Sequence, residues 1–403
     1  MPATMRVATP SSGIRPTNGE DEPLFEHAPP LAVQRLLGLV GAGNFNVKRR
    51  ALLVALIAWL PLVLLTILQS LWTRADTVTS LAWETGVHAR YLLAAPLLVL
   101  AEAVCAPRLN TIARHFVDSG IVGERDRTSF QDAVASTRRL LVSPAAEIVV
   151  IALAYLVAIG SAWSYAPDQL PAWAQSAAGV PRYSLAGWWH TLASLPLLLM
   201  LIFGWFWRLA LWTRLLWCIS RFDLRLVASH PDHCAGLGFL SQSVRAFAIV
   251  ATALAVIVAG RSAHIVLGGG GLPTQHFYFN IGLLVAVLAL FVAPLLVFAP
   301  VMLSVWQSGT FTYGALADRV GHAFERKWFD GNKIEPDALE KPDFSATTDL
   351  YAIVANVEAM RFVPVDLKAL ISLAVAMVLP FVPVVLMAFP LEEIWKHIKS
   401  LLL

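Results

Sequence analysis

The stretch ASHPDHCAGLGFL, residues 228–240, gathers the side chains of this sequence that are best suited to chemistry. Four of them are of types that bind zinc: His230, Asp232, His233 and Cys234. Structural zinc sites usually separate two pairs of ligands by a dozen or more residues, and no second pair is visible here. Pro231 stiffens the run so that adjacent side chains diverge, and only the distant His115 or His322 could complete a ligand set. We therefore predict no metal site and no cofactor.

The same residues suit a turn between two helices. Pro231 fixes its own φ angle and pushes His230 towards an extended conformation, and Asp232 can cap the turn that follows. The two glycines permit a close approach of the backbone. We predict an elbow with two alternative roles, structural support or pH sensing, for four residues: His230, Asp232, Gly236 and Gly238.

Three arginines precede the elbow: Arg214, Arg221 and Arg225. On a continuous helix, at roughly 100° per residue, they fall within about 40° of one another, so we predict a basic cytosolic face on a long fourth membrane helix. A basic helix followed by His-Pro-Asp is also the signature of J-domain co-chaperones. That domain needs a soluble helix after the tripeptide, whereas an apolar segment soon follows here, so the similarity does not predict a J-domain.

The composition indicates a membrane protein. Of the 403 residues, 57% are hydrophobic and 14% are charged, whereas a soluble globular protein has about 25% charged residues. The mean hydropathy is +0.65. The net charge of +3 is small and the basic residues are not gathered in one patch, so no nucleic-acid partner is predicted. The three cysteines lie far apart and are expected to be reduced.

A helix that crosses a membrane needs roughly 20 predominantly apolar residues. Seven apolar stretches have this length or nearly so: 51–71, 88–106, 145–165, 188–207, 246–267, 279–305 and 370–389. With the N-terminus inside, 24 of the 30 Lys and Arg residues fall in the N-terminal tail and three loops: 107–143, 208–245 and 307–368. Cytosolic loops are expected to hold that excess. We therefore predict an all-α fold with seven transmembrane helices within residues 51–389, N-terminus inside and C-terminus outside. Tryptophans are expected to form a lipid-facing outer rim: Trp163, Trp173, Trp188 and Trp189.

The two ends of the chain predict surface segments. Residues 1–30 are rich in Pro, Ser, Thr and charge and predict a disordered tail. Residues 31–50 predict a helix on the membrane surface followed by a basic stop, and residues 390–403 predict an amphipathic helix on the outer surface. The lipid bilayer and its anionic headgroups are therefore expected partners.

The predicted cytosolic loops contain apolar residues at helical spacing. Tyr313–Trp328 shows intervals of three and four, and a second helix is predicted after a cap at Ser345 or Thr347. An amphipathic piece is predicted within 130–141. We expect these helices to form a small cytosolic layer in which the apolar stripes bury one another.

Ionisable residues inside apolar segments are functional candidates by default. Glu102 lies in the second predicted span and Glu147 lies one turn into the third. Glu102 either pairs structurally with Arg139 or Arg208 or provides a site for a proton or a cation. Prolines interrupt four of the spans and free carbonyls that an ion path could use, although membrane helices also tolerate proline without such a role.

A resemblance rests on the segment DLRLVASHPDHCAGLGFL, on the later FERKW, and on a proline-bearing last span that ends in LEE. These residues resemble a family of uncharacterised bacterial inner-membrane proteins, whose elbow reads His-Pro-Asp, three residues, then Gly-Leu-Gly-Phe-Leu. The resemblance covers roughly the second half of the chain. It implies a multi-pass protein of the bacterial inner (plasma) membrane but no known activity. The family has Arg-Ala-Gly where this chain has His233, Cys234 and Ala235, which weakens the metal interpretation.

Two classes of function fit these observations. A channel or transporter for an ion or small solute would use the proline-bearing spans, Glu102 and the basic cytosolic face. A non-catalytic membrane scaffold or assembly partner would use the cytosolic helices, with a second copy of the chain or another membrane protein as its partner. An enzyme ranks third, because no Ser/His/Asp set, phosphate-binding loop or pair of carboxylates is visible in the sequence.

Overall fold

The computed structural model describes Phe25 and the ranges 47–74, 76–164, 170–176, 183–269, 274–329 and 342–388. The predicted tail and surface helix within 1–46, except Phe25, and the amphipathic helix at 390–403 lie outside the described residues. Within those ranges the chain is helical, apart from loops and two isolated β-bridges. The all-α prediction is confirmed for this part of the chain.

The long helices, in chain order, are α2 (Val47–Thr73), α5 (Ala95–Asp118), α6 (Arg127–Leu141), α7 (Pro144–Ser164), α9 (Leu195–Ile219), α11 (Ala248–Leu267), α12 (Thr274–Val292), α13 (Ala299–Trp328), α14 (Asp343–Glu358) and α15 (Leu367–Val378). The shorter helices are α3 (Thr77–Ala82), α4 (Thr85–His88), α8 (Leu185–Trp189), α10 (Ser241–Ala246) and α16 (Val382–Ala388). Two π-helical stretches join α4 to α5 and α8 to α9: Ala89–Ala94 and His190–Ser194. Each is soon followed by a proline, which lacks the amide that closes a regular turn.

Seven helical segments among the described residues are long and apolar enough to cross a membrane: Val47–Thr73, Thr85–Asp118, Pro144–Ser164, Leu185–Ile219, Gly238–Leu267, Tyr278–Trp328 and Leu367–Ala388. Large apolar side chains on these segments are exposed, among them Leu68, Leu156 and Ile371. Soluble proteins rarely leave extended apolar surface in contact with water. The chain is therefore a multi-pass membrane protein, and the prediction of seven membrane-length apolar helices is confirmed.

The second and sixth segments are longer than predicted. α5 continues past Pro107 to Asp118, because a proline removes one hydrogen bond of the helix without necessarily ending it. The sixth segment is divided instead of continuous. α12 ends at Val292, a 3₁₀ stretch follows at Ala293–Phe298, and α13 then runs on to Trp328.

The fourth segment ends earlier than the predicted long helix. α9 stops at Ile219, and Ser220 forms its C-cap. Arg221 and Arg225 therefore lie in the loop beyond the helix. The prediction that they share one helical face with Arg214 is wrong, because the helix ends at Ile219, before Arg221 and Arg225.

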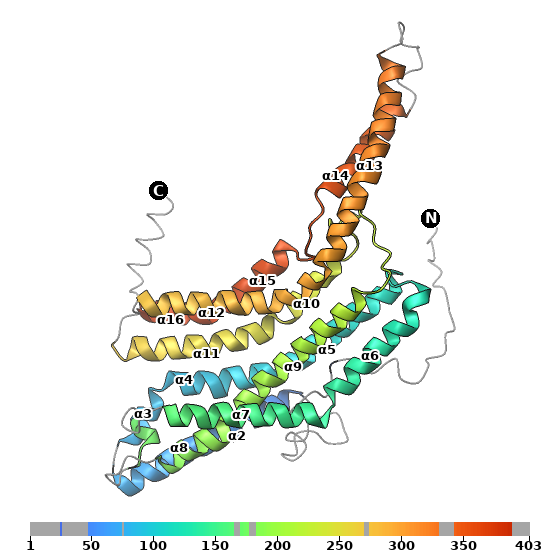
Figure 1. Cartoon of the computed structure of the whole chain (residues 1–403). Helices are drawn as coiled ribbons and strands as arrows, with labels where there is room; N and C mark the ends of the chain where they lie inside the picture. Colours follow the sequence, from blue (N-terminus) through green and yellow to red (C-terminus); the bar gives the residue numbers. More distant parts are fainter. Residues whose placement is uncertain are drawn as a thin grey trace, which may run out of the picture.

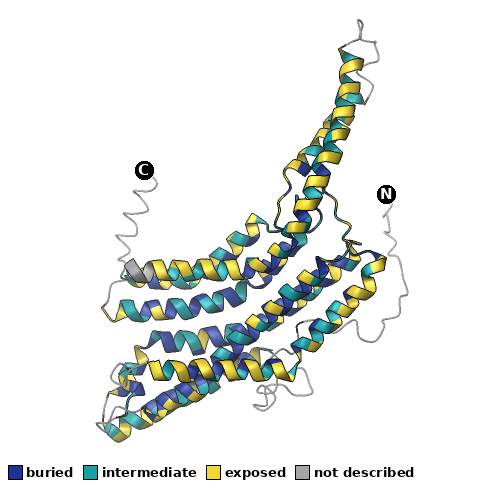
Figure 2. Ribbon diagram, in the orientation of Figure 1, coloured by how far each residue is buried: buried dark blue, intermediate teal, exposed yellow. Residues whose placement is uncertain are grey.

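The core of the bundle is formed mainly by α5, α9 and α11, where buried residues are most frequent (Figure 2). Fully buried side chains include Leu98 and Leu109 on α5, Trp212 on α9 and Phe247 just before α11. α7 and α15 lie at the periphery and present mainly exposed apolar residues. The amphipathic piece predicted within 130–141 is confirmed as helix α6, which packs on α9.

α13 and α14 pack along each other as a hairpin that projects away from the bundle (Figure 1). Near the tip, the rings of Phe324, Trp328 and Phe344 contact one another. An ion pair between Lys327 and Asp343 joins the two helices at the same level. We call this pair of helices the stalk.

Both predicted helices of the stalk are confirmed, but the predicted cap of the second is wrong. α14 begins at Asp343, so Ser345 and Thr347 lie inside the helix. The Thr347 hydroxyl donates a hydrogen bond to the Asp343 carbonyl, 2.8 Å away, as threonines inside helices often do.

The predicted tryptophan rim is confirmed in part. Trp163 and Trp188 are exposed, as side chains at a membrane interface are expected to be. Trp173 is 2% exposed and packs against the His190 ring, so its assignment to the rim is wrong. Trp189 is partly buried against the core.

Candidate functional site

The elbow wraps its backbone around one carboxylate. Asp232 Oδ1 accepts hydrogen bonds from the amides of Cys234, at 2.8 Å, and Gly236, at 3.2 Å. Asp232 Oδ2 accepts one from the amide of Gly238, at 2.8 Å. His230 Nδ1 lies 2.8 Å from Asp232 Oδ1. The structure thus brings the four predicted elbow residues together around Asp232.

This tight path needs unusual backbone angles. The φ angles of His233, Ala235 and Gly236 are +53°, +55° and +93°. For residues other than glycine such angles cost roughly 1–2 kcal/mol each, so the hydrogen bonds to Asp232 must hold them. A Cβ atom on Gly238 would lie 2.9 Å from Asp232 Oδ2, which is closer than a normal contact. Glycine is therefore required at 238 by space.

The elbow shifts the pKa values of its carboxyl and its thiol in opposite directions. Burial raises the pKa of the Asp232 carboxyl, but its backbone amide donors and His230 together lower that pKa below its usual value. Burial raises the pKa of the Cys234 thiol to about 11, so the thiol is protonated at neutral pH. Zinc binds cysteine as the thiolate, so a metal ion at Cys234 would have to displace this proton. Within the described ranges, no group of three or more His, Cys, Asp or Glu side chains is placed to hold a metal ion.

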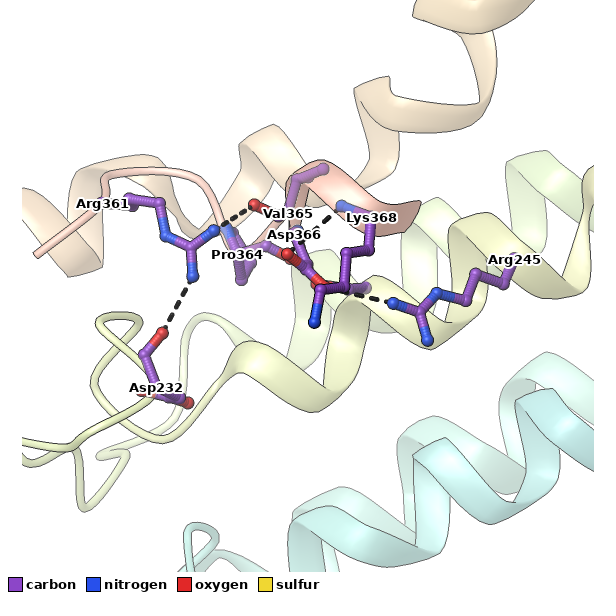
Figure 3. Close-up of polar contacts among 8 residues, drawn as sticks. Asp232, Arg245, Arg361, Pro364, Val365, Asp366 and Lys368 are labelled. Carbon is purple, nitrogen blue, oxygen red and sulfur yellow. Dashed lines mark hydrogen bonds and ion pairs between the residues drawn. The ribbon is translucent and has the colours of Figure 1, made fainter. Parts of the chain in front are cut away.

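A second set of contacts joins the elbow to the segment between α14 and α15 (Figure 3). The Arg361 guanidinium donates to the carbonyls of Asp232, at 3.0 Å, and Val365, at 2.9 Å. Arg245 Nη2 lies 3.1 Å from Asp366 Oδ2, and Asp366 also caps α15. Figure 3 shows these side chains bridging α10 and the start of α15.

The elbow also contacts the end of α5 and the loop after it. The amide of Arg225 donates to the Ile121 carbonyl at 2.9 Å, beside a β-bridge between Val122 and Leu224. The Phe239 ring packs edge-on against His115, with ring centroids 4.4 Å apart. The first predicted loop, 107–143, is therefore held against the second, 208–245.

The base of the stalk completes the junction. The hydroxyls of Ser229 and Tyr313 lie 3.1 Å apart, which joins the elbow to α13. Gly309 of α13 allows Ala228 to approach so closely that a Cβ atom at 309 would lie 2.6 Å from the Ala228 Cβ. The elbow is a structural junction between α5, the stalk and α15.

The three predicted arginines occupy separate positions at this end of the bundle. Arg214 Nη2 donates to the Ser136 hydroxyl of α6 at 2.9 Å. Arg221 lies over the Trp217 ring, and the side chain of Arg225 packs against Gly123. Each arginine therefore contacts a different part of the chain, and the structure does not bring the three together.

Glu102 lies between two guanidinium groups. Its Oε2 is 2.9 Å from Arg50 Nη2 on α2, and its Oε1 is 3.3 Å from Arg208 Nη2 on α9. The side chains are 12% exposed for Arg50 and Glu102 and 6% exposed for Arg208. The predicted pairing with Arg208 is confirmed, whereas the participation of Arg50 was not predicted. We call these three residues the charge cluster.

Glu147 lies apart in the first turn of α7, where it is half-buried. A carboxylate in the first turn of a helix interacts favourably with the helix dipole. α5, which carries Glu102, packs on both α2 and α9, and α7 also packs on α9. The two predicted glutamates thus lie on different helices that share α9 as a neighbour.

No family model, curated protein or solved structure matches this chain. The resemblance of the elbow to a bacterial inner-membrane family therefore stays a prediction. The function has to be argued from the geometry of the sites themselves.

Two partly buried aromatic–histidine pairs were not predicted from the sequence. Trp59 Nε1 donates to His88 Nδ1 at 2.9 Å, and His88 Nε2 lies 3.0 Å from the Leu81 carbonyl. The Tyr91 hydroxyl lies 3.0 Å from His190 Nδ1. Both histidines sit at a π-helical stretch before a proline, and π-helical turns are frequent at functional sites. In both segments a histidine precedes a proline, and this repeated order is the one signal in the sequence that could have indicated these histidines.

These sites differ in what they can do chemically. The elbow carboxylate is surrounded by amides of its own loop, which suits it to hold the junction rather than to react. In the charge cluster each oxygen of Glu102 contacts a guanidinium, and these two positive charges beside the carboxylate repel a further cation. The geometry therefore argues against Glu102 as a cation site.

Proposed function

We propose that this chain is a multi-pass protein of the bacterial inner membrane that serves as a scaffold, holding a partner on its stalk. The single observation that carries this proposal is the projection of α13 and α14 away from the bundle (Figure 1). A helix of 30 residues is about 45 Å long, so α13 alone can reach well beyond the headgroups. We further propose that the stalk lies in the cytosol, because the loops at this end hold most of the Lys and Arg residues.

The surface of the stalk supports a contact function. Phe311 is 79% exposed and Phe329 is 75% exposed, and Tyr351 of α14 is also exposed. Large aromatic residues are enriched in protein interfaces because they bury much apolar area at little entropic cost. A second copy of the chain or another membrane protein is the proposed partner.

The junction at the base supports the same role. Contacts from Ser229, Arg361 and Gly309 tie the stalk and the following segment to the elbow. A partner bound to the stalk would therefore be held at a defined position relative to the membrane helices. A flexible tether would need no such contacts.

Transport by the membrane helices is the second candidate. It is favoured by the helix break at Ala293–Phe298, where Pro294 and Pro300 free backbone carbonyls. Two other carbonyls that prolines leave free are used in packing instead. Thr252 Oγ1 lies 3.1 Å from the Ala376 carbonyl, four residues before Pro380. Tyr155 donates to the Leu192 carbonyl at 3.2 Å, four residues before Pro196. These contacts give Pro196 and Pro380 a structural role.

Site-specific photo-crosslinking in cells tests the scaffold proposal. A photoreactive phenylalanine analogue would replace Phe329 or Tyr351 on the stalk, with Leu156 on the exposed face of α7 as the matched control. We expect a discrete adduct from the stalk positions and not from Leu156. The same adduct from purified protein in liposomes would identify a second copy. If the stalk positions give no more crosslinked adduct than the Leu156 control, the proposal is overturned.

Flux measurements separate the second candidate from the first. Liposomes containing the purified protein would be tested with a panel of inorganic cations and anions and with protons. Flux of any of these solutes above that of protein-free liposomes would support transport. Permeability equal to that of protein-free liposomes would exclude transport of the tested solutes and leave the scaffold role as the proposed function.

A further inference from the structure

We propose that the stalk binds a second copy of this chain, with the two α13 helices antiparallel. The contact is made by six exposed residues of α13 and its C-cap, which we call the outer stripe: Phe311, Ala315, Asp318, His322, Glu325 and Phe329. This inference rests on the proposed scaffold role and names its partner.

The outer stripe has the spacing of a coiled-coil seam. Its residues follow one another at intervals of four, three, four, three and four, which is the repeat that lets two helices pack along each other. At roughly 100° per residue they lie within about 40° of one line along the helix. α14 contacts α13 elsewhere, for example at Phe324, whose position is turned by about 140° from that line. The other helix of the stalk therefore leaves the outer stripe uncovered.

The order of residue types in the outer stripe favours a second copy over an unrelated partner. The stripe is symmetrical about position 320, because Phe311 and Phe329 lie nine residues to either side, and Asp318 and His322 lie two residues to either side. A two-fold axis at this position places each Phe311 beside Phe329 of the other copy. The same axis places each Asp318 beside His322 of the other copy. Such self-complementarity is what a contact between identical surfaces requires.

Apolar layers form the two ends of this contact. Phe311 is 79% exposed and Phe329 is 75% exposed, so their pairing removes much apolar surface from water. The next layer places Ala315 beside Glu325 of the other copy, where the small side chain leaves room for the long one. The symmetry repeats both layers at the opposite end, so two aromatic pairs anchor the contact.

The charged middle of the outer stripe sets the direction of pairing. Asp318 forms no ion pair within the described ranges, and His322 Nδ1 lies 3.5 Å from Glu325 Oε2 of its own helix. His322 Nε2 is left for the Asp318 carboxylate of the other copy. In a parallel pair each residue would instead face its own equivalent, so Asp318 would meet Asp318 and Glu325 would meet Glu325. Like charges placed together oppose that arrangement.

The direction of the stalk allows the contact within one membrane. α13 leaves the bundle steeply inclined to α11 and α12 (Figure 1). A two-fold axis along the membrane helices keeps both copies in the same orientation in the bilayer and turns their stalks to opposite lateral directions. Two stalks related in this way run past each other antiparallel.

The membrane surface is the alternative occupant of the outer stripe, and it fits less well. Helices that lie on a membrane have an unbroken apolar face and cations on the polar face. Here the carboxylates of Asp318 and Glu325 interrupt the apolar residues. Anionic headgroups repel these carboxylates.

Disulfide crosslinking in isolated membranes tests the pairing and its direction. Two differently tagged copies of the full chain are coexpressed, one with Phe311→Cys and the other with Phe329→Cys, and are oxidised with copper phenanthroline. We expect a crosslink between these copies and little between copies with the same substitution, whose cysteines would lie about 27 Å apart along the helices. Ala323→Cys in both copies is the matched control, because Ala323 is exposed on α13 outside the outer stripe. The wild-type chain gives the background from the native cysteines.

The affinity of the two copies gives a second measurement, by energy transfer between labelled chains diluted in a neutral detergent. We expect Phe311→Ala to weaken the dimer about tenfold, because the aromatic anchor is lost twice in each dimer. Leu316→Ala removes exposed apolar atoms of α13 outside the outer stripe and should weaken the dimer less than about twofold. Equal losses in the two variants would overturn the proposal.

The crosslinks separate this inference from the scaffold role on which it rests. Crosslinks between identical substitutions only would show a parallel pair and overturn the antiparallel contact. Crosslinking no greater than in the Ala323→Cys control would overturn the second copy as the partner. A discrete photoadduct of the Phe329 position with a different protein would then leave the scaffold proposal standing, whereas photoadducts with lipid alone would assign the outer stripe to the membrane surface and overturn both.

Discussion

Glu102 in the bundle and Asp232 in the elbow are both partly buried carboxylates, but they have opposite kinds of partners. Asp232 is held by three backbone amides within six residues of itself. Glu102 is held by guanidiniums from two other helices, 52 and 106 positions away in the chain. One carboxylate organises its own loop, whereas the other joins separate elements of the fold.

The difference separates a carboxylate that orders a local turn from one that forms ion pairs between helices. The amides around Asp232 are neutral, so they satisfy the acceptors of the carboxylate without cancelling its negative charge. Glu102 instead contacts guanidiniums, so its contacts combine hydrogen bonding with opposite charge. Polar residue types alone do not distinguish the two, because what matters is the count and charge of the partners.

The largest effect is expected from Glu102→Gln. This substitution leaves two buried guanidiniums without their carboxylate, and breaking such a buried pair costs about 3–5 kcal/mol. Unfolding of the purified protein by SDS in mixed micelles would measure the loss. Glu124→Gln is the control, because the pair of Glu124 with Arg127 is exposed, and its free energy of unfolding should change by less than about 1 kcal/mol. A Glu102 variant as stable as its control would show that the cluster does not join the helices.

Asp232→Ala should have the next largest effect, about 2–3 kcal/mol, because the Cys234, Gly236 and Gly238 amides lose their acceptor. The pKa of Asp232 is lower in the folded protein than in the unfolded chain. Its stabilising contribution is therefore complete above about pH 4 and is lost as the pH falls through the folded pKa.

A pH series of the same unfolding measurement checks the assignment. The wild-type protein should lose stability on the acid side of that window, and Asp232→Asn should lose less because it has no proton to gain. Identical acid limbs in the two proteins would show that Asp232 does not stabilise the elbow through its charge.

The sequence predicted the features that depend on local patterns. Hydropathy is a property of each segment, so the apolar membrane-length helices, α6 and both helices of the stalk were found. Pro231 and the glycines marked the elbow as a turn for the same reason. The end of α9 was missed, because the spacing of Arg214, Arg221 and Arg225 suits a helix but does not require one.

Contacts between distant segments could not be predicted in the same way. Arg50 meets Glu102 only because α2 packs on α5, and nothing in either segment specifies that neighbour. Tyr91 and His190 likewise meet across 99 positions of sequence. Choosing between Arg139 and Arg208 as the partner of Glu102 also required knowing which helices lie side by side.

A smaller effect is expected from Gly238→Ala. The added Cβ would lie 2.9 Å from Asp232 Oδ2 and 3.1 Å from Asp232 Cβ, so the loop has to shift. We expect a loss of about 1–2 kcal/mol, measured by the same unfolding assay. Gly314→Ala is the control, because its Cβ would have no neighbour within 4 Å and alanine favours the helix α13. A loss equal in both variants would argue against steric contact with the carboxylate.

The smallest effect is expected from His230→Gln, which asks whether the elbow senses pH. The imidazole is 43% exposed and reaches the Asp232 carboxylate through one nitrogen, whereas three amides remain in place without it. An exposed pair of this kind contributes less than about 1 kcal/mol. We therefore expect nearly unchanged stability between pH 5 and pH 8, measured by unfolding at each pH in the wild-type protein and the variant. A stability difference between the two proteins that grows as the pH falls would instead make the imidazole part of the junction, with a charged partner beside Asp232 as Glu102 has in the bundle.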